Sequence, residues 1–349
     1  MIYDVLVVGA GPAGSTFARM ATEESGKILI IDGKTIKGKK PCGGLLAPDT
    51  QKALAHMDLV LPNSVLADPQ IFSVRTIDVC HRLVRFYPRH YLNVDRHAFD
   101  SWLFSLVPDS VDKVNGVVTA IRKEDGVFIV TVKELGRESE YRAKRIVGAD
   151  GANSIVRRTF FGDNIYHYVA IQQWYEGKKD INAFYSCVFD EKTSESCSWS
   201  IFKNGYFIYG GCFEGKNCRE KFEQQKERMK GFDGFDFGEI VKTEACLALR
   251  PKKMSDFVTG KDGVFLVGEA AGFISPSSFE GISYAITSGR ILAEAFKNGK
   301  GNVEEKYFSM TRKIRIKLAI KMIKRWFMYT PAVRFLVMKS GIESIKLWK

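Results

Sequence analysis

The sequence lacks any regular arrangement of cysteines, although seven are present among its 349 residues. They lie at irregular spacing, their count is odd, and no two of them form a CxxC pair. This pattern argues against a disulfide framework and against a zinc site, and it is typical of a reduced, cytoplasmic protein. We therefore expect no metal, and we expect most of the cysteines to be buried as small apolar residues.

Long apolar runs are also absent. No uninterrupted stretch of 18 apolar residues occurs, so no membrane-spanning helix is expected. The first predicted strand begins at Ile2 and leads directly into a glycine-rich turn, which leaves no room for a signal peptide. Neither repeats nor low-complexity tracts interrupt the chain. With 45% hydrophobic and 26% charged residues, the composition is that of a globular protein with a full core.

Acidic residues are missing from residues 306–341, which contain ten lysines or arginines, in a chain of net charge +12. Within this stretch an apolar stripe is formed by Ile316, Ile320, Ile323 and Phe327, and Trp326 lies next to its end. A second stripe consists of Lys313, Lys317, Lys321 and Lys324. The spacing predicts a basic amphipathic helix. Such a helix lies on an anionic membrane surface, covers an apolar substrate entrance, or packs on its own domain with a solvated basic face. No nucleic-acid-binding module accompanies the charge, so nucleic acid is not expected.

What the sequence does contain is a dinucleotide fingerprint. The GAGPAG run at residues 9–14 follows a predicted buried strand and opens a predicted helix. Gly9 permits the tight turn, Gly11 lets the backbone approach a pyrophosphate, and Gly14 lets helix and strand pack closely. Pro12 and Ala13 complete the turn, and Asp32 ends the second strand, where its carboxylate can bind a ribose diol. These residues alone do not separate FAD from NAD.

Two later segments favour FAD. The DG pair Asp150–Gly151 and the GEAA run containing Glu269 each follow a predicted strand. They resemble the DG motif and the second FAD segment, usually GDAA, of flavoprotein hydroxylases and their relatives. The resemblance implies that both carboxylates lie by ribose or ribityl hydroxyls. It also implies that the helix beginning at Gly281 and Ile282 points its N-terminus at the flavin. Arg96, at the start of another predicted helix, matches an arginine that often reaches FAD in that family; the alternative is an ordinary surface charge.

The PCGG run at residues 41–44 indicates the branch of this family. It resembles the motif of geranylgeranyl-reductase-like flavoproteins, which implies that Cys42, Gly43 and Gly44 lie against the isoalloxazine. The likeness extends over nearly the whole chain and is strongest to the bacterial CbrA-type members. Cys42 is either a reactive thiol or proton donor, aided by Lys39 and Lys40, or a neutral residue beneath the ring.

The chain departs from the family pattern at three positions. Glu269 stands where Asp is usual, and Phe279 replaces the first glycine of a PxxGxG stretch, which is expected to place an aromatic ring beside the flavin. In residues 197–203 only Trp199 and Lys203 match the reductase signature, and only Trp199 and Ile201 match the halogenase signature. We expect Trp199 and Phe279 to act with Cys42 in catalysis, although Trp199 is equally explained as a core residue of the sheet.

Together these features predict a mixed α/β fold in which a Rossmann-type FAD-binding domain is interleaved with an antiparallel substrate sheet. The FAD domain would comprise residues 1–60, 93–163 and 256–298, and the sheet residues 61–92 and 164–255. The basic helical region would comprise residues 299–349.

The expected function is an FAD-dependent oxidoreductase that reduces double bonds of an isoprenoid or other lipophilic substrate. NAD(P)H would be a transient electron donor, because the sequence has no second dinucleotide fingerprint. The alternatives are a single-component FAD monooxygenase and a non-enzymatic flavin-binding redox sensor at the membrane surface. The expected location is cytoplasmic, with possible peripheral binding to the inner membrane face; the sequence indicates no oligomeric state.

Overall fold

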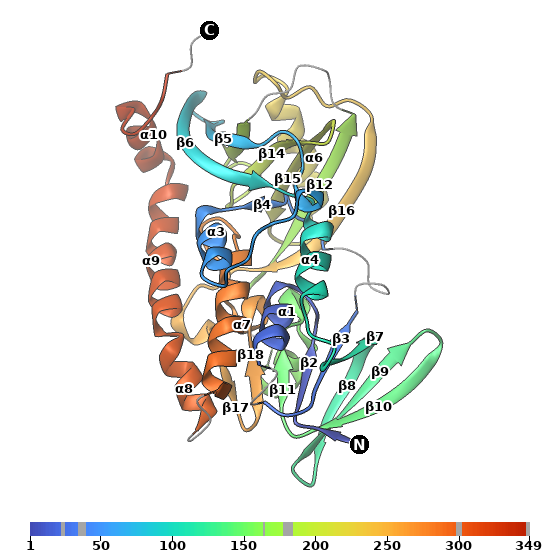
Figure 1. The fold of residues 1–349 in the computed structure, drawn as a ribbon. Coiled ribbons are helices and arrows are strands. Elements are labelled where there is room, and N and C mark those ends of the chain that lie inside the picture. The colour runs from blue at the N-terminus through green and yellow to red at the C-terminus, as the bar shows by residue number, and fades with distance from the viewer. Residues whose placement is uncertain (22–24, 34–39, 163–164, 177–183, 298–301, 347–349) are drawn as a thin grey trace.

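The computed structural model describes residues 1–21, 25–33, 40–162, 165–176, 184–297 and 302–346 (Figure 1). Helices and strands each account for about 34% of the chain, and the strands form three sheets. The predicted mixed α/β fold with a Rossmann-type portion is confirmed.

A six-stranded sheet forms the centre of the dinucleotide-binding portion. Its strand order is β17-β18-β11-β2-β3-β7, and all neighbours are parallel except β17 and β18. The strands are β2 (Val5–Val8), β3 (Ile28–Asp32), β7 (Asp112–Asn115), β11 (Ile146–Gly148), β17 (Gly260–Lys261) and β18 (Val264–Leu266). Nearly every residue of β2, β3, β11 and β18 is buried, which is typical of a parallel sheet covered on both faces.

Helices cover one face of this sheet, and a smaller sheet extends from its lower end. The helices α1 (Pro12–Met20) and α7 (Ile282–Lys297) approach so closely that a Cβ on Gly289 would lie 2.4 Å from the carbonyl oxygen of Ala13. Helix α4 (Arg96–Ser105) also contacts α1. The second sheet has the order β1-β10-β9-β8 and projects at the lower right of Figure 1; its strands are β1 (Ile2–Tyr3), β8 (Val117–Glu124), β9 (Val127–Glu134) and β10 (Arg137–Ala143). Helix α5 (Ile155–Phe161) contacts β8 and β11.

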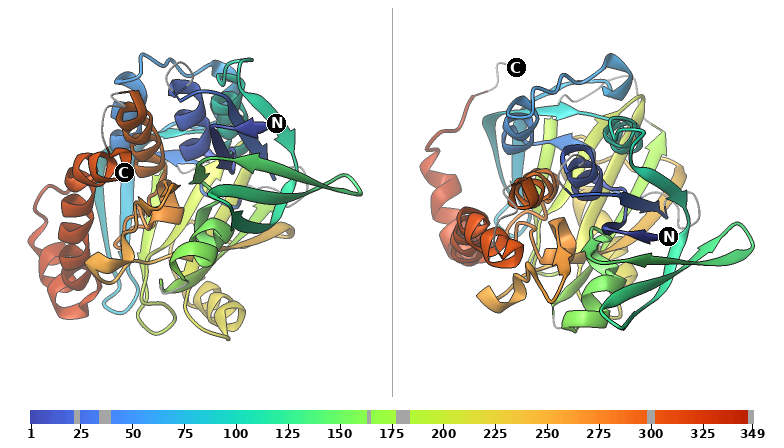
Figure 2. Two further views of the ribbon diagram at one scale, coloured as in Figure 1. Left: turned by 90° about the horizontal axis from the view of Figure 1, so that it is seen from below. Right: turned by 60° about the horizontal axis from the view of Figure 1, so that its bottom comes forward.

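The third sheet has eight strands, in the order β16-β12-β15-β14-β13-β5-β6-β4. They are β4 (Leu45–Leu46), β5 (Ile71–Asp78), β6 (Leu83–Asn93), β12 (His167–Glu176), β13 (Phe184–Phe189), β14 (Ser198–Lys203), β15 (Tyr206–Phe213) and β16 (Ile240–Leu249). All neighbours are antiparallel except β13 and β5, which pair in parallel. Strand β4 comes from the range predicted for the FAD domain, yet it joins this sheet through β6. Figure 2 shows the chain passing from one portion to the other and back.

One helix lies where the sequence predicted only strands. Residues Cys218–Met229 form α6, not part of the antiparallel sheet. Phe222, Gln225, Lys226 and Met229 are its buried residues, and their spacing is that of one helix face. The prediction failed because strands β15 and β16 lie on either side of this segment in the sequence. The short helix α3 (Pro48–Ala55) lies beside α7.

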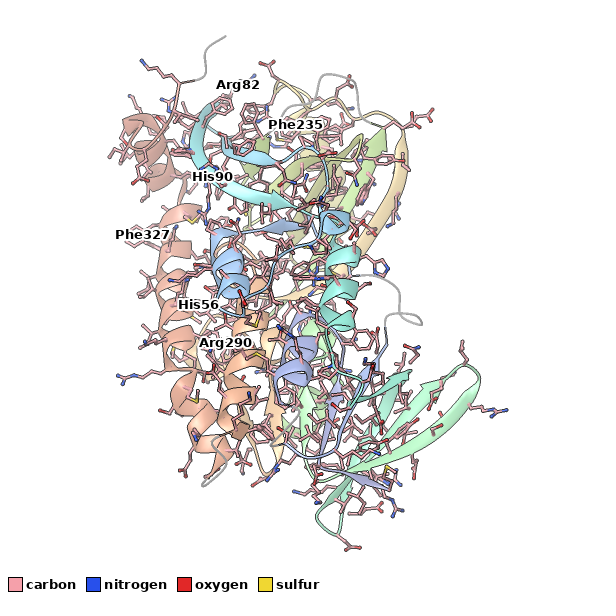
Figure 3. All side chains as sticks on the ribbon, in the orientation of Figure 1. His56, Arg82, His90, Phe235, Arg290 and Phe327 are labelled. Atoms are coloured by element: carbon pink, nitrogen blue, oxygen red, sulfur yellow. The ribbon has the colours of Figure 1, made fainter. Side chains whose placement is uncertain are left out.

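The C-terminal region contains three helices, α8 (Val303–Met310), α9 (Arg312–Tyr329) and α10 (Pro331–Ser340). Pro331 begins α10 at the position where proline is tolerated in a helix, and α9 ends just before it. The buried side chains of α9 are Ile314 and Leu318, whereas the predicted apolar stripe is exposed. Figure 3 labels one stripe residue, Phe327, at the left-hand edge of the molecule. Within the described ranges, no helix has both the length and the apolar character needed to cross a bilayer.

Candidate active site

The glycine-rich turn lies where the order of the parallel sheet reverses. From β2 the chain first continues to β3 on one side, and it later returns as β11 on the other side of β2. Ligands of open α/β sheets bind in the crevice at the carboxyl end of strands at such a switch point. Gly9 to Gly14 follow the carboxyl end of β2, so the fold places the fingerprint at this crevice.

The three fingerprint glycines have different surroundings. Gly9 has a φ of +102°, and a Cβ there would lie 2.6 Å from the carbonyl oxygen of Ala149. A Cβ on Gly14 would lie only 1.9 Å from the carbonyl oxygen of Gly9. A Cβ on Gly11 would meet no protein atom within 4 Å, and this residue precedes α1 without a side-chain cap. The space over Gly11 and the N–H groups at the start of α1 therefore fit a pyrophosphate.

A single cavity of about 1310 Å³ joins this crevice to the eight-stranded sheet. Every predicted site residue except Gly14 lines it; these residues are Gly9, Gly11, Pro12, Ala13, Asp32, Cys42, Gly43, Gly44, Arg96, Asp150, Gly151, Trp199, Glu269, Phe279, Gly281 and Ile282. Gly14 instead has the packing role expected of it. The structure thus brings together residues that lie as far apart as positions 9 and 282.

The PCGG loop packs directly on strand β14. A Cβ on Gly43 would lie 2.7 Å from the Ile201 side chain, and one on Gly44 would lie 2.2 Å from Nζ of Lys203. Nζ of Lys203 donates to the carbonyl oxygens of Gly43 at 2.8 Å and Val94 at 2.5 Å. Burial lowers the pKa of Lys203 to about 8. In the sequence Lys203 is only a match to the reductase signature. In the structure its hydrogen bonds fix the PCGG loop against β14.

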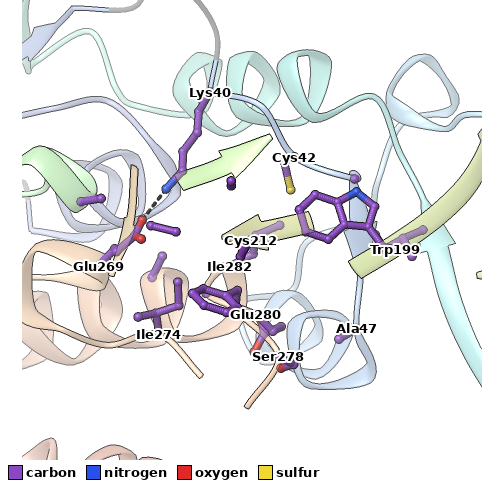
Figure 4. Close-up of a pocket in the computed structure, with 18 of the residues that line it drawn as sticks. Lys40, Cys42, Ala47, Trp199, Cys212, Glu269, Ile274, Ser278, Glu280 and Ile282 are labelled. Atoms are coloured by element: carbon purple, nitrogen blue, oxygen red, sulfur yellow. Dashed lines mark hydrogen bonds and ion pairs between the residues drawn. The ribbon is translucent and has the colours of Figure 1, made fainter. Parts of the chain in front are cut away.

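Trp199 and Cys42 lie on the same wall of the cavity (Figure 4). The indole packs against Gly210 of β15, where a Cβ would lie 2.6 Å from the ring, so Trp199 is also a packing residue of the sheet. Its Nε1 is buried and donates to none of the described residues. The thiol of Cys42 accepts from the backbone N–H of Gly44 at 3.4 Å and hydrogen-bonds the Arg96 side chain. Lys39 lies outside the described residues.

Arg96 is not an ordinary surface charge. Its guanidinium pairs with Asp100 at 2.9 Å and lines the cavity. Burial alone would lower the pKa of Arg96, but Asp100 and Cys42 together outweigh burial and raise it. The arginine is therefore a fixed cation beside Cys42.

The two predicted acidic residues are held by protein partners. Glu269 forms an ion pair with Lys40, drawn in Figure 4, and accepts from the backbone N–H of Leu249 at 3.0 Å. Burial opposes the charge on Lys40, but Glu269 raises the pKa of Lys40 overall. Asp150 accepts from Ser154 at 2.6 Å and from the N–H of Val156 at 3.3 Å, and burial raises the pKa of Asp150. Both carboxylates thus line the crevice and also stabilise its loops through these contacts.

Phe279 occupies a backbone position that favours glycine. Its φ is +53°, which explains why the family pattern has glycine there. The ring packs edge-on against Tyr168, with centroids 5.5 Å apart, and lies near the guanidinium of Arg250. Arg250 is fully buried and donates to Pro276 O, Glu195 O and the hydroxyl of Tyr168 at 2.8–3.1 Å. Sequence reasoning missed Arg250, because no motif marks a buried arginine bound by carbonyl groups.

The start of α7 carries an acidic residue that the sequence analysis also missed. Glu280 lines the cavity and accepts from both the N–H and the hydroxyl of Ser283, at 2.9 Å each. One of the free N–H groups at the N-terminus of α7 therefore already binds a protein carboxylate.

The cysteines are distributed differently from the expectation. All seven are free, but only Cys197 and Cys212 are buried, and Cys80 is exposed. Five of them line the cavity, namely Cys42, Cys187, Cys197, Cys212 and Cys246. Cys187 and Cys197 hydrogen-bond each other, and this contact lowers the pKa of Cys197 to about 7.

Comparison with known proteins identifies the family. The CbrA proteins of Escherichia coli O157:H7 and Shigella sonnei (strain Ss046) are each 45% identical to this chain over 349 residues, 98% of this chain and 98% of each relative. The chain belongs to the CbrA family. This result confirms the resemblance drawn from the PCGG loop and the flanking motifs.

The family model described as pyridine nucleotide-disulphide oxidoreductase matches residues 3–173 of this CbrA-family chain. Among solved structures, a geranylgeranyl bacteriochlorophyll reductase-like protein from Thermoplasma acidophilum has a TM-score of 0.84 at 20% identity, covering 99% of this chain and 92% of that one. PqsL, a probable FAD-dependent monooxygenase from Pseudomonas aeruginosa, has a TM-score of 0.71 at 15% identity, covering 98% and 99%. The CbrA-family fold is therefore that of the FAD-dependent oxidoreductases.

Proposed function

We propose that this chain binds FAD and reduces a double bond of an isoprenoid or another lipophilic substrate. The observation that carries the proposal is the single cavity that runs from the fingerprint glycines to an apolar chamber against the eight-stranded sheet. Its volume of about 1310 Å³ exceeds the ~300–1,000 Å³ typical of a pocket for one ligand. It therefore has room for a dinucleotide and a second molecule.

The crevice residues fit the parts of FAD. The open space over Gly11 and the start of α1 would hold the pyrophosphate, and Asp32, at the end of β3, would bind a ribose. The PCGG loop and Ile282 would flank the ring system. When bound, reduced FAD supplies the hydride. NAD(P)H is proposed as the transient donor that reduces it, because the sequence has no second fingerprint.

The chamber beyond the PCGG loop supports a lipophilic substrate. Its lining includes Val74, Ala170, Ile201 and Ala248, together with the rings of Trp199 and Phe279. Apolar walls of this kind bind apolar ligands by removing both surfaces from water. They also exclude the water that would compete with reduction.

Adding a hydride to one carbon of a double bond requires a proton at the other carbon. Cys42 is the proposed donor, because its thiol lies in the cavity wall. Arg96 would stabilise the thiolate left behind until a proton returns from solvent. Trp199 and Phe279 are proposed to position the substrate against the cofactor.

The test uses the purified, flavin-loaded protein and a polyprenyl lipid without oxygen. Protein reduced by dithionite should convert the lipid to a product with two more hydrogen atoms, and the flavin should return to its oxidised spectrum. Cys42→Ala should slow this conversion while flavin content stays unchanged. A product that gains an oxygen atom, formed only with oxygen and NADPH, would instead identify a monooxygenase, whose fold this chain shares. Failure of both reactions with every lipid offered would favour a flavin-binding redox sensor.

A further inference from the structure

Helices α9 and α10 expose a continuous set of large apolar side chains, which we call the docking face. On α9 the set comprises Ile316, Ile320, Ile323, Trp326 and Phe327, and on α10 it comprises Leu336 and Val337. Ile320, Ile323 and Trp326 are each 61–63% exposed, and Leu336 is 66% exposed. Scattered apolar residues are normal on a surface, but a contiguous patch marks a binding surface.

The face stays exposed because the helices are fixed from the opposite side. At 3.6 residues per turn, buried Ile314 and Leu318 point roughly opposite to the α9 part of the docking face. Tyr329 closes the end of α9, donating to Ser277 O at 2.8 Å and accepting from the N–H of Cys197 at 2.9 Å. The exposed stripe is therefore held outward by packing and is not the result of a detached helix.

The charges around the face divide into two groups. Lys317 pairs with Asp49 at 2.7 Å, and Lys321 lies over the ring of Tyr284, so these two lysines bind their own domain. Lys313, Lys324 and Lys339 are exposed, and none of them pairs with an acid in the described part of the chain. Residues 306–341 contain no acid; the first one after them is Glu343. The charge available at the face is thus almost entirely positive.

The cavity opens at the same face. Its outer lining includes Lys324, Phe327, Val333 and Val337. Two of these, Phe327 and Val337, also belong to the docking face, so the mouth and the apolar patch are continuous. A molecule leaving an apolar phase at this face could enter the cavity without crossing water.

We propose that the docking face of α9 and α10 binds the surface of an anionic bilayer, with Ile320, Ile323 and Trp326 inserted among the lipids. The exposed lysines then lie at the headgroups, where each contributes electrostatic attraction. The proposal rests on the proposed function only in its last step, in which the lipophilic substrate passes from the bilayer into the cavity mouth.

The experiment measures binding of the flavin-loaded protein to vesicles, and it needs no turnover. Vesicles of phosphatidylcholine with phosphatidylglycerol should sediment the protein at low salt, and pure phosphatidylcholine should sediment far less of it. High salt should release it, because the screening length falls from ~10 Å at 0.1 M to ~3 Å at 1 M. Lipids brominated in the acyl chain should quench Trp326, and Trp326→Phe should lose that quenching while still binding.

Two pairs of variants separate the face from general surface effects. Ile320→Ser, Ile323→Ser and Trp326→Ser together should abolish sedimentation and keep the flavin. The matched control, Val60→Ser, Leu135→Ser and Ile240→Ser, changes exposed apolar residues elsewhere and should bind normally. Lys313→Gln with Lys339→Gln should weaken binding by about fivefold per lysine, roughly 25-fold in all, whereas Lys133→Gln with Lys216→Gln should not.

The docking proposal would be overturned if wild-type protein did not bind the anionic vesicles at low salt, or if the triple serine variant of the docking face bound them as wild type does. It would also be overturned if wild-type protein formed a dimer that bound no vesicles and that the triple serine variant could not form. The last outcome would make a second copy of the chain the occupant. Reduction of a detergent-dispersed lipid by protein that ignores vesicles would leave the proposed function standing. Vesicle binding without reduction would overturn the function alone.

Discussion

At the scale of single residues, Gly11 and Gly14 lie in one turn but differ in what surrounds them. A Cβ on Gly14 would collide with the backbone of Gly9, whereas a Cβ on Gly11 would enter open space. Gly11→Val should therefore fold normally and lose the flavin, because the side chain would fill the space that we assign to the pyrophosphate. Gly14→Ala should lower the stability of the protein itself.

Both variants can be compared by circular dichroism and by the flavin absorbance of the purified protein. The expected pattern is a colourless, folded Gly11→Val protein and a poorly folded Gly14→Ala protein. A yellow Gly11→Val protein with full flavin content would mean that the cofactor does not approach this turn.

Phe279 allows the strain of its backbone to be measured separately from the packing of its ring. Alanine and glycine both remove the ring from Tyr168 and Arg250, but only glycine adopts the observed φ of +53° without strain. Phe279→Gly should thus be more stable than Phe279→Ala by about 1 kcal/mol in urea unfolding. Equal stabilities would show that the backbone relaxes in the variants and that wild type stores no strain here.

At the scale of elements, α10 depends on one buried ion pair. Arg334 donates to Asp78 at 2.8 Å and to Glu191 at 2.9 Å, and the side chain of Asp78 is completely buried. Arg334→Met would leave that carboxylate without its main partner, which typically costs about 3–5 kcal/mol. We expect α10 to detach, so that hydrogen exchange becomes faster in residues 331–340 and changes less in the rest of the protein. Adding Asp78→Asn should restore much of the protection, because the unpaired charge is then removed.

The same pair gives α10 a defined response to acid. Burial alone would raise the pKa of Asp78, but hydrogen bonds from Arg334 and His81 lower it below its ordinary value. The contribution of Asp78 to stability is therefore complete above its unfolded pKa of about 3.9 and is lost as pH falls through the lower folded value. The protection factors of the α10 amides, corrected for the intrinsic exchange rate at each pH, should stay high at pH 5 and fall only in stronger acid.

The elements that the sequence predicted well are those whose signal is local. A strand, a glycine turn and a helix start occupy adjacent positions in residues 5–20, and the strands before Asp150 and Glu269 are equally short-range patterns. Helix α6 was missed because its neighbours in sequence are strands, and the period of its four buried residues is brief. The apolar stripe of α9 was correctly recognised, but an amphipathic pattern alone does not show which face of the helix packs against the rest of the protein.

At the scale of the whole molecule, the site depends on pairings that no local pattern encodes. The PCGG loop meets β14 through Lys203, whose partners Gly43 and Val94 lie 160 and 109 residues away. Such contacts follow from the register of a mixed sheet, whereas in the sequence Lys203 is recognisable only as a motif match. The predicted residues nevertheless meet in one cavity, because many of them, such as Asp32, Arg96 and Ile282, lie at the end of a strand or the start of a helix.

The five cysteines of the cavity provide a test of its continuity. Cys42 belongs to the PCGG loop, and Sγ of Cys246 lies 3.9 Å from the carbonyl oxygen of Pro41 in the same loop. Cys187 and Cys197 lie in the chamber near Tyr329, whose hydroxyl accepts from the N–H of Cys197. Brief maleimide labelling at neutral pH, read by peptide mass spectrometry, should modify Cys42, Cys246 and Cys197 in the apoprotein, because all three line the cavity. FAD should protect Cys42 and Cys246 and leave Cys197 reactive. A lipophilic ligand added afterwards should protect Cys197 as well, while exposed Cys80 reacts throughout. Equal protection of Cys42, Cys246 and Cys197 by FAD alone would show that the cofactor, and not a second molecule, fills the chamber.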